Sequence, residues 1–534
     1  MKYILFITGI LLNLNLKAQD IPSDAIMASE KIKPHAIRAH MRYLADDLLE
    51  GRKPFTRGYR LAAHYVASEF EEMGLKPGVD DSSYYQMVEL FKNRSIIEGT
   101  LNLSWNQETR TLIPGKDFIL LSEPDQIDPS EKEIVFGGIG VQDPSLGYHD
   151  LENLKVRNKY VILYYWHPED RGTVLALKHM HDERLRRLKT AGAAGVIMYI
   201  PAENQERLSW ERFKYYFNRA GYKSTCLDFP VFLIDWKITN NLFNSTMPSL
   251  REYNTGNALP HQYKINASLK PDLNLNKDFE IRKSPNVLAY IEGSDPKMKN
   301  EFVVYTAHLD HEGIGQPMEG DSIYNGAYDN AAGIAIMLEI ARAFTELPEP
   351  PRRSVLFIAL TAEEMGLLGS EYFVNHPTIP LDDMVASLNT DMFLMEKPLT
   401  ELVALGEEFS SLADLAQQVC QQKKVRIIPD PLPEENAFMR SDHFSFVKKG
   451  IPSLFIINSF YKSDTLNGNS DVNYRWLKTL YHTPLDNFRE NINYEAGVTY
   501  AQINFLIGYL AAEQKDRIKW NFYFETEDGL DLRK

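Results

Sequence analysis

The chain has 534 residues, of which 44% are hydrophobic and 25% are charged. It is therefore too long for one hydrophobic core and too apolar to be disordered, and we expect a soluble protein of two or three domains. Its formal net charge of -15 disfavours nucleic acids and anionic membranes as partners. Two cysteines, Cys226 and Cys420, are too few for a disulfide scaffold or a thiolate metal site. The sequence leaves open whether these two form a single disulfide bridge.

The N-terminus has the pattern of a secretory signal peptide. Lys2 precedes an apolar run over residues 4–16, and a small residue, Ala18, precedes a polar stretch. The run is too short to span a bilayer, and no second long apolar stretch follows it. We expect cleavage after residue 18 and export to a periplasm or to the medium without membrane insertion. The alternative is a buried N-terminal strand.

The segment after the signal peptide predicts an amphipathic helix. Apolar residues recur at helical spacing over residues 61–73, and Gly74 stands where a helix cap is expected. Between residues 134 and 269 the pattern changes to short strands at 134–141, 160–166, 195–200 and 230–235, with one helix near 178–191. This middle region carries no cluster of metal ligands and no nucleophile motif, so we expect it to be a compact, non-catalytic α+β unit.

From residue 287 onward, apolar runs alternate with helices. The runs are FVVYTA, SVLFIAL, VASLN and PSLFII, and the helices are expected at 331–344, 411–422 and 494–512. Such alternation predicts an α/β fold with a mostly parallel mixed sheet sandwiched by helices. Ligands of such sheets bind at the carboxyl ends of the strands.

Charged or imidazole side chains follow three of these runs, and two more stand in loops flanked by Gly or Pro. The seven side chains are His308 and Asp310, Glu363 and Glu364, Asp391, Asp329 and His482. Taken singly, each could be a hydrogen-bonded structural residue or a helix cap. Taken together, they predict a convergent site at one edge of the sheet.

Imidazoles and carboxylates without thiolates suit catalytic zinc. Two zinc ions that share a carboxylate need five protein ligands, and five of the seven residues make up that number: His308, Asp329, Glu364, Asp391 and His482. Asp310 could accept the second N–H of the His308 ring. Glu363 then remains as a general base, because adjacent carboxylates do not readily serve one metal.

The same residues resemble the M28 zinc metallopeptidases. The motifs that carry the resemblance are AHLDHEG, GDSIYNGAYDNAAG, LTAEEMGLLGSEYF, LNTDMF, RSDHFSFVKKGIPSLF and YHTPLDN. The family's zinc-exopeptidase fold, which is phosphorylase/hydrolase-like, agrees with the α/β prediction. The resemblance implies two Zn²⁺ ions bridged by Asp329, with His308 and Asp391 completing one site and Glu364 and His482 completing the other. It also matches Glu363 to the general base.

The rest of the chain is similar to other parts of such enzymes. DLENLKVRNKYVILYYW and LKTAGAAGVIMYI resemble a protease-associated domain inserted into the peptidase domain. The division this implies is a signal peptide at 1–18, an N-terminal part of the peptidase domain at 19–128, the inserted domain at 129–275, and the main peptidase part at 276–534.

The resemblance implies an aminopeptidase acting on peptide substrates. A carboxypeptidase or dipeptidase of the same family would share every metal ligand, and Tyr481, Asp442 and His443 are the residues expected near the substrate, with Arg440 as a further candidate. A glutaminyl-cyclase-like transferase resembles the fold but uses one zinc and generally lacks the insertion. The alternative from another class is a binding protein that keeps the fold without the chemistry.

Overall fold

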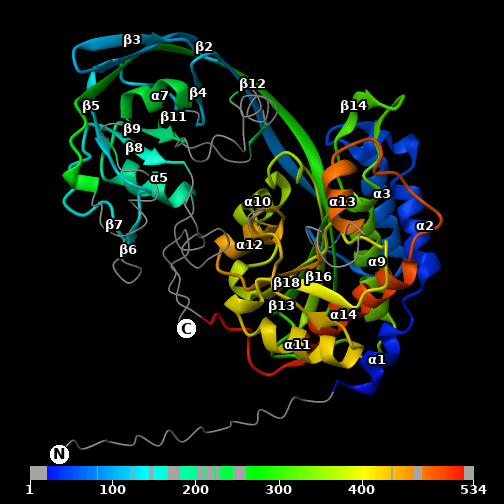
Figure 1. The fold of residues 1–534 in the computed structure, drawn as a ribbon. Coiled ribbons are helices and arrows are strands. Elements are labelled where there is room, and N and C mark those ends of the chain that lie inside the picture. The colour runs from blue at the N-terminus through cyan, green and yellow to red at the C-terminus, as the bar shows by residue number, and fades with distance from the viewer. Residues whose placement is uncertain are drawn as a thin grey trace, which may run out of the picture.

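The computed structural model describes residues 21–521 except 81, 123, 144–147, 166–180, 201–209, 211–221, 224–227, 244–246, 248–259, 434–436 and 461–471. The described residues form two lobes joined by a long two-stranded ribbon (Figure 1). The predicted signal peptide and Cys226 lie outside the described residues, whereas Cys420 is a free, buried thiol. No helix of the described part is both long and apolar enough for a membrane crossing.

The larger lobe is built on a mixed sheet. Its strands follow the order β19, β18, β20, β17, β13, β16, β12. Strand β13 is parallel to β16 and β17, and β17 is parallel to β20, whereas β12 and β18 run antiparallel to their neighbours β16 and β20. The bounds are β12 (Ala267–Ile291), β13 (Phe302–His308), β16 (Ser354–Leu360), β17 (Met384–Asn389), β18 (Glu401–Leu405), β19 (Arg426–Ile427) and β20 (Ser453–Asn458). The predicted mostly parallel sheet is confirmed.

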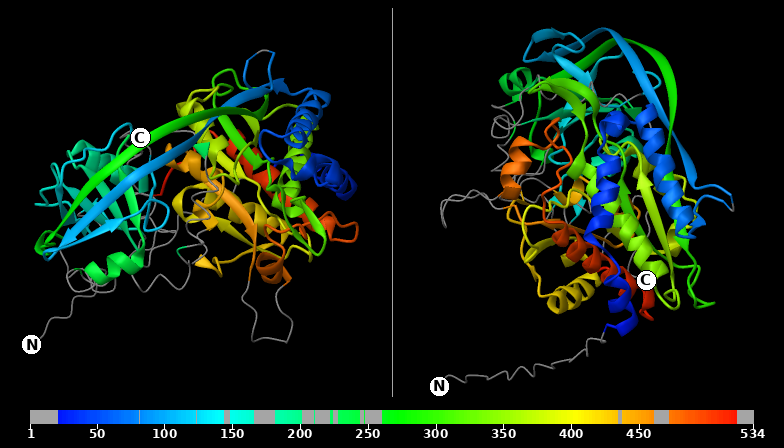
Figure 2. Two further views of the ribbon diagram at one scale, coloured as in Figure 1. Left: turned by 90° about the horizontal axis from the view of Figure 1, so that it is seen from above. Right: turned by 90° about the vertical axis from the view of Figure 1, so that its right-hand side faces the viewer.

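Helices cover both faces of this sheet, as Figure 2 shows from two further sides. Along β13, Val303 and Tyr305 pack into the core of one face and Val304 into that of the other, so the strand is buried on both sides. One face is covered by α1 (Ser23–Ser29), α2 (Pro34–Leu44), α3 (Arg57–Glu72), α9 (Ala332–Thr345), α11 (Leu412–Lys423) and α14 (Tyr494–Glu513). The other is covered by α10 (Leu368–Asn375) and α12 (His443–Lys448).

The predicted helix cap at Gly74 is confirmed. Helix α3 ends at Glu72, and Gly74 follows with a φ of 77°, a conformation that glycine adopts without steric cost. The N–H of Leu75 donates to the carbonyl of Phe70 at 3.0 Å, which satisfies one of the last free carbonyls of the helix.

The ribbon consists of β2 (Tyr85–Trp105) and β12, paired antiparallel without a break from Tyr85 and Val287 to Trp105 and Ala267. At one end it belongs to the sheet of the larger lobe, and at the other it pairs with β3 (Glu108–Leu112) and β5 (Lys132–Phe136). The two lobes are thus linked by continuous backbone pairing rather than by a loop.

The smaller lobe contains the strands expected in the middle of the chain. Strands β5, β8 (Tyr160–Tyr164), β9 (Gly195–Tyr199) and β11 (Val231–Ile234) are parallel, with α5 (His181–Thr190) and α7 (Trp236–Phe243) beside them. Strand β4 (Phe118–Leu120) pairs antiparallel with β11, so residues 118–120 also contribute to this sheet. The division at 19–128, 129–275 and 276–534 stays a prediction.

Candidate metal centre

Three side chains converge at the carboxyl ends of the central strands. His308 is the last residue of β13, and Asp391 lies two residues beyond the end of β17. The Nε2 atom of His308 lies 3.2 Å from an oxygen of Asp391 and 3.2 Å from Oδ1 of Asp329. All three side chains are buried.

A second group shares Asp329 with the first. The Nε2 atom of His482 lies 3.1 Å from Oδ2 of Asp329 and 3.0 Å from Oε2 of Glu364. Ligand atoms bonded to a tetrahedral zinc at 2.0–2.1 Å lie roughly 3.3 Å from one another. The separations in both groups are close to this value, so the five residues predicted as ligands fit two ions that share Asp329.

The electrostatics of the cluster favour bound cations. Burial lowers the pKa of His308, but the nearby Asp391, Glu363 and Asp329 outweigh it and hold the pKa well above its usual range. The same competition, with Glu364 and Asp329 as the acidic partners, raises the pKa of His482 to about 11. The buried carboxylates therefore favour positive charge at both imidazoles. Metal ions bound between these side chains would supply that positive charge.

Asp329 is held in place through its main chain. It lies in the turn η5 (Ala327–Ala331), and the Asp329–Asn330 peptide bond is cis. The buried carboxylate of Asp486 accepts hydrogen bonds from the N–H groups of Tyr328 and Asp329 at 3.0–3.2 Å. The side chain of Asn330 donates to the carbonyl of Thr390 at 3.0 Å, which ties this turn to the loop that carries Asp391.

Asp310 acts differently from the prediction. The Nδ1 atom of His308 faces the main-chain carbonyl of Asp310 at 3.1 Å, so that carbonyl, and not the carboxylate, accepts the second N–H of the ring. The Asp310 carboxylate instead accepts the N–H groups of Glu363 at 3.1 Å and Glu364 at 3.4 Å. Because β13 ends at His308, residue 310 no longer follows strand alternation, and its side chain points to the neighbouring loop.

The orientation of Asp391 depends on a contact that the sequence did not predict. The hydroxyl of Ser441 donates to Oδ2 of Asp391 at 2.6 Å, and the side chain of Asn389 donates to Ser441 at 2.7 Å. The first bond leaves Oδ1 of Asp391 facing His308. Buried partners of this kind orient metal ligands in proteins.

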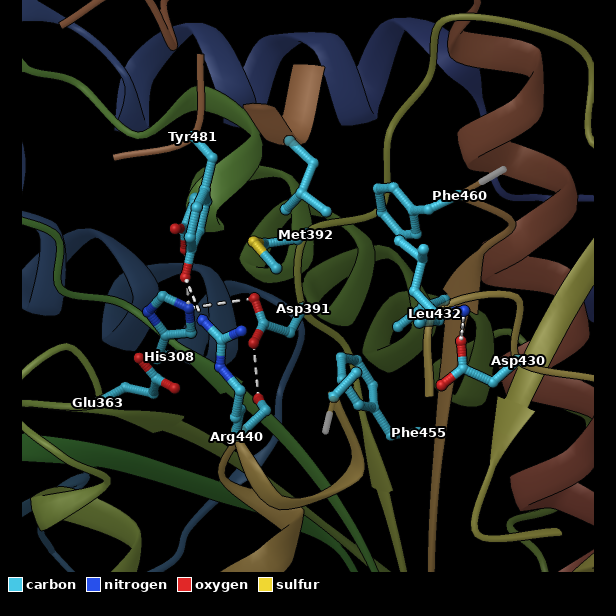
Figure 3. Close-up of a pocket in the computed structure, with 15 residues that line it drawn as sticks. His308, Glu363, Asp391, Met392, Asp430, Leu432, Arg440, Phe455, Phe460 and Tyr481 are labelled. Atoms are coloured by element: carbon cyan, nitrogen blue, oxygen red, sulfur yellow. Dashed lines mark hydrogen bonds and ion pairs between the residues drawn. The ribbon is translucent and has the colours of Figure 1, made fainter. Parts of the chain in front are cut away.

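Glu363 lines the pocket beside these groups and is outside both candidate ligand sets. Burial, together with the charges of Glu364 and Asp391, raises the pKa of its carboxyl well above the usual range. Figure 3 shows Glu363 next to His308, on the polar side of the pocket. This is the location in which a carboxylate could take up a proton from a reacting water.

The pocket has a polar and an apolar side (Figure 3). Tyr481 and Arg440 lie on the polar side, where Arg440 donates to the hydroxyl of Tyr481 at 3.5 Å. The apolar residues that line the pocket are Met392, Leu432, Ala437, Phe455, Ile457, Phe460 and Leu477. Figure 3 shows Leu432 and Phe460 on the side away from His308, with Asp430 near the far end.

Two residues expected near the substrate lie elsewhere. Asp442 and His443 are fully buried and are not among the described residues that line the pocket. The ring of His443 packs at 5.0 Å from the rings of both Phe438 and Phe455, and burial lowers its pKa to about 3. Because Asp442 precedes α12, the helix carries both side chains into the core, whereas Ser441 and Arg440 remain at the pocket.

Residues 286–506 match the model of peptidase family M28. This segment belongs to peptidase family M28. The matched segment begins in β12 and ends in α14, so it contains both candidate ligand groups and Glu363. The resemblance drawn from the sequence motifs is confirmed. The M28 segment makes up most of the larger lobe, which also contains the N-terminal helices and the end of α14.

Several relatives of this chain are named as aminopeptidases. It is 31% identical over 151 residues to aminopeptidase NAALADL1 of Mus musculus, an alignment that covers 25% of this chain and 18% of that one. It is 30% identical over 245 residues to a probable leucine aminopeptidase 2 of Aspergillus oryzae, covering 43% and 45% of the two chains. The chain thus spans less than half the length of these two curated relatives.

Among solved structures, an aminopeptidase from Aneurinibacillus sp. strain AM-1 is similar. The superposition has a TM-score of 0.46 and 17% identity, and it covers 92% of this chain and 97% of that one.

One histidine and one glutamate of the M28 segment lie at the centre, although the sequence analysis did not select them as site residues. Nδ1 of His311 lies 2.6 Å from Oε1 of Glu364, and a carboxylate oxygen of Glu312 lies 3.9 Å from Nδ1 of His482. Both residues follow directly after Asp310 in AHLDHEG. Their position within the AHLDHEG motif is the sequence signal that could have identified them.

Proposed function

We propose that the chain is an exported exopeptidase with two zinc ions, which removes residues from the N-terminus of peptides. The observation that carries the proposal is the position of Asp329, whose two carboxylate oxygens face different histidines at 3.2 and 3.1 Å. A single shared carboxylate between two ligand groups is what a pair of ions about 3.5–4 Å apart requires.

The ligands would be divided between the ions as follows. His308 and Asp391 would complete one site, and Glu364 and His482 would complete the other. When bound, zinc supplies Lewis-acid polarisation of the scissile carbonyl and lowers the pKa of the attacking water.

The other groups of the pocket carry out proton transfer and orientation. Glu363 would accept a proton from the attacking water and deliver it to the departing amine. The hydroxyl of Tyr481, which points toward His308 in Figure 3, would donate to the oxygen that gains negative charge. The apolar wall around Phe455 and Phe460 would bind a hydrophobic side chain next to the scissile bond.

A second function is favoured by a specific observation. The guanidinium of Arg440 lies at the polar side of the pocket, next to Tyr481. A cation there suits a substrate carboxylate, which is the requirement of a carboxypeptidase or dipeptidase.

One panel of peptides separates the two functions. We expect free-amine peptides with an apolar first residue to be cleaved and their N-acetylated counterparts to be resistant. C-terminal amidation should leave the rate unchanged. Loss of cleavage on amidation, with N-acetylated peptides still cleaved, would instead establish the carboxypeptidase.

Export is tested separately. The N-terminus of the mature protein, recovered from a secreting host and sequenced, should begin at residue 19. A mature protein that still carries residues 1–18 would contradict the predicted cleavage.

A further inference from the structure

We propose that His311 is a fourth protein ligand of the second candidate metal ion. The other three would be Asp329, Glu364 and His482. The inference rests on the proposed two-zinc site and adds a residue to it. It also makes the two ions unequal, because the first ion would have only three protein ligands.

The position of the His311 ring places it at the second ion and away from the first. Its Nδ1 atom lies 2.6 Å from Oε1 of Glu364 and 3.9 Å from Oδ2 of Asp329. The other oxygen of Glu364 lies 3.0 Å from Nε2 of His482. The Glu364 carboxylate therefore lies between two imidazoles, and the ligand atoms of His311, Asp329 and Glu364 all lie within 4.8 Å of one another.

The contact between His311 and Glu364 is short, but it leaves buried polar atoms without a well-directed hydrogen bond. Nδ1 of His311 and Oε1 of Glu364 are 2.6 Å apart, yet neither atom has a hydrogen-bond partner among the described residues. Nε2 of His311 also has no hydrogen-bond partner in the part of the chain that the structure describes. Buried polar atoms of this kind are costly unless another group satisfies them. A cation bound by both Nδ1 and Oε1 would satisfy two of the three.

Packing fixes the ring in this place. His311 is 1% exposed, whereas the side chain of His482 is 33% exposed. Gly326, with a φ of 58°, lies so close that a Cβ atom on it would stand 2.6 Å from Cγ of the His311 ring. Any larger residue at position 326 would displace the imidazole. The ring is thus ordered before a metal binds, which favours tight binding.

The two ions would then have different roles. Four protein groups would hold the second ion firmly, while three protein groups leave an open position at the first, as catalytic zinc requires. Under a chelator, the ion at His308 and Asp391 should leave first and the ion at His311 should leave last.

The test measures zinc per chain by mass spectrometry after graded dialysis against a chelator, for the full-length protein and three variants. His311→Ala should bind the second zinc at least about 100-fold less tightly than the wild type. The ion at His308 and Asp391 should then no longer leave before the ion at position 311. His311→Asn keeps an N–H donor near the Nδ1 position but is a poor zinc ligand, and it should behave like the alanine variant. His443→Ala, which removes a buried imidazole from the same lobe, is the matched control and should release zinc as the wild type does.

A second readout covers the case in which the alanine variant does not fold. In the cobalt-substituted protein, His311→Asn should change the visible absorption of one of the two ions. An asparagine variant with wild-type zinc retention and an unchanged cobalt spectrum would show that His311 only packs against Glu364 and would overturn the proposal. A wild-type protein without zinc would contradict the proposed function itself, so the two failures are distinguishable.

Discussion

At the scale of single residues, the centre depends on which atom of each side chain faces which neighbour. His308 directs Nδ1 to the carbonyl of Asp310 and so presents Nε2 to Asp329 and Asp391. Asp329 presents one oxygen to His308 and the other to His482. These orientations turn a set of buried charges into two sites that share one carboxylate.

Removal of the charge of Glu363 tests its role in proton transfer. Glu363→Gln keeps the shape of the side chain but cannot accept a proton, so kcat should fall by about 10²–10⁴-fold or more. Zinc content should stay at the wild-type value, because Glu363 belongs to neither ligand group. A glutamine variant with full activity would remove Glu363 from the mechanism.

Removal of the Ser441 hydroxyl tests the support of Asp391. Ser441→Ala deletes the 2.6 Å hydrogen bond to Oδ2 of Asp391 and frees that carboxylate to rotate. Affinity for one zinc ion should fall by about 10–100-fold in chelator competition. Ser445→Ala is the control, since that buried hydroxyl bonds Ser370 at 3.0 Å instead. Equal zinc affinity in both variants would exclude this support.

At the scale of elements, the sequence was most informative where strands end. Three parallel strands of the sheet lead into His308, Glu363 and Asp391, and the apolar runs before them were sufficient to predict that these side chains meet. Local pattern also predicted the helices α9, α11 and α14 and the cap at Gly74.

Other contacts could not be predicted because they join segments that lie far apart in the sequence. Asp486 holds a turn 157 positions away, and Ser441 orients a residue 50 positions away. Periodicity and motif spacing carry no information on such pairs. The prediction for Asp310 failed for a related reason, since strand alternation does not extend past the end of β13.

Arg52 is the strongest case of such a long-range contact. It ends η1 (Asp47–Arg52) and is fully buried, and its guanidinium donates to the carbonyls of Leu309, Asn325 and Gly326 at 2.6–3.0 Å. It therefore fastens together the loop after β13 and the loop before Asp329. Burial lowers its pKa to about 10, although nearby acidic groups act against this.

Loss of this guanidinium should destabilise the larger lobe. Each carbonyl left without a partner costs about 1–3 kcal/mol, so Arg52→Met should lower the free energy of unfolding in urea by at least about 3 kcal/mol. Arg60→Met, at an exposed position on α3, should change it by less than about 0.5 kcal/mol. Similar midpoints and slopes for the two variants would contradict the role of Arg52.

At the scale of the whole molecule, the M28 segment and the N-terminal helices form one lobe around the candidate metal centre. The smaller lobe is attached by β2 and β12, whose pairing is continuous between the lobes (Figure 1). The carboxylates at the centre repel one another when no cation is present. Metal binding and the stability of the larger lobe should therefore be linked.

Metal removal tests this linkage. At free zinc about 100-fold above Kd, each site should add about 2.7 kcal/mol to stability. Calorimetry should show a transition at clearly lower temperature after dialysis against a chelator, and added zinc should restore it. A transition temperature that chelation leaves unchanged would mean that bound metal does not contribute to the stability of the larger lobe.

The most direct test of the account is a crystal structure of the zinc-loaded protein with anomalous scattering measured at the zinc edge. We expect two peaks about 3.5–4 Å apart on either side of Asp329, one beside His308 and one beside His482. A single peak, or two peaks of which only one touches Asp329, would contradict the two-zinc centre.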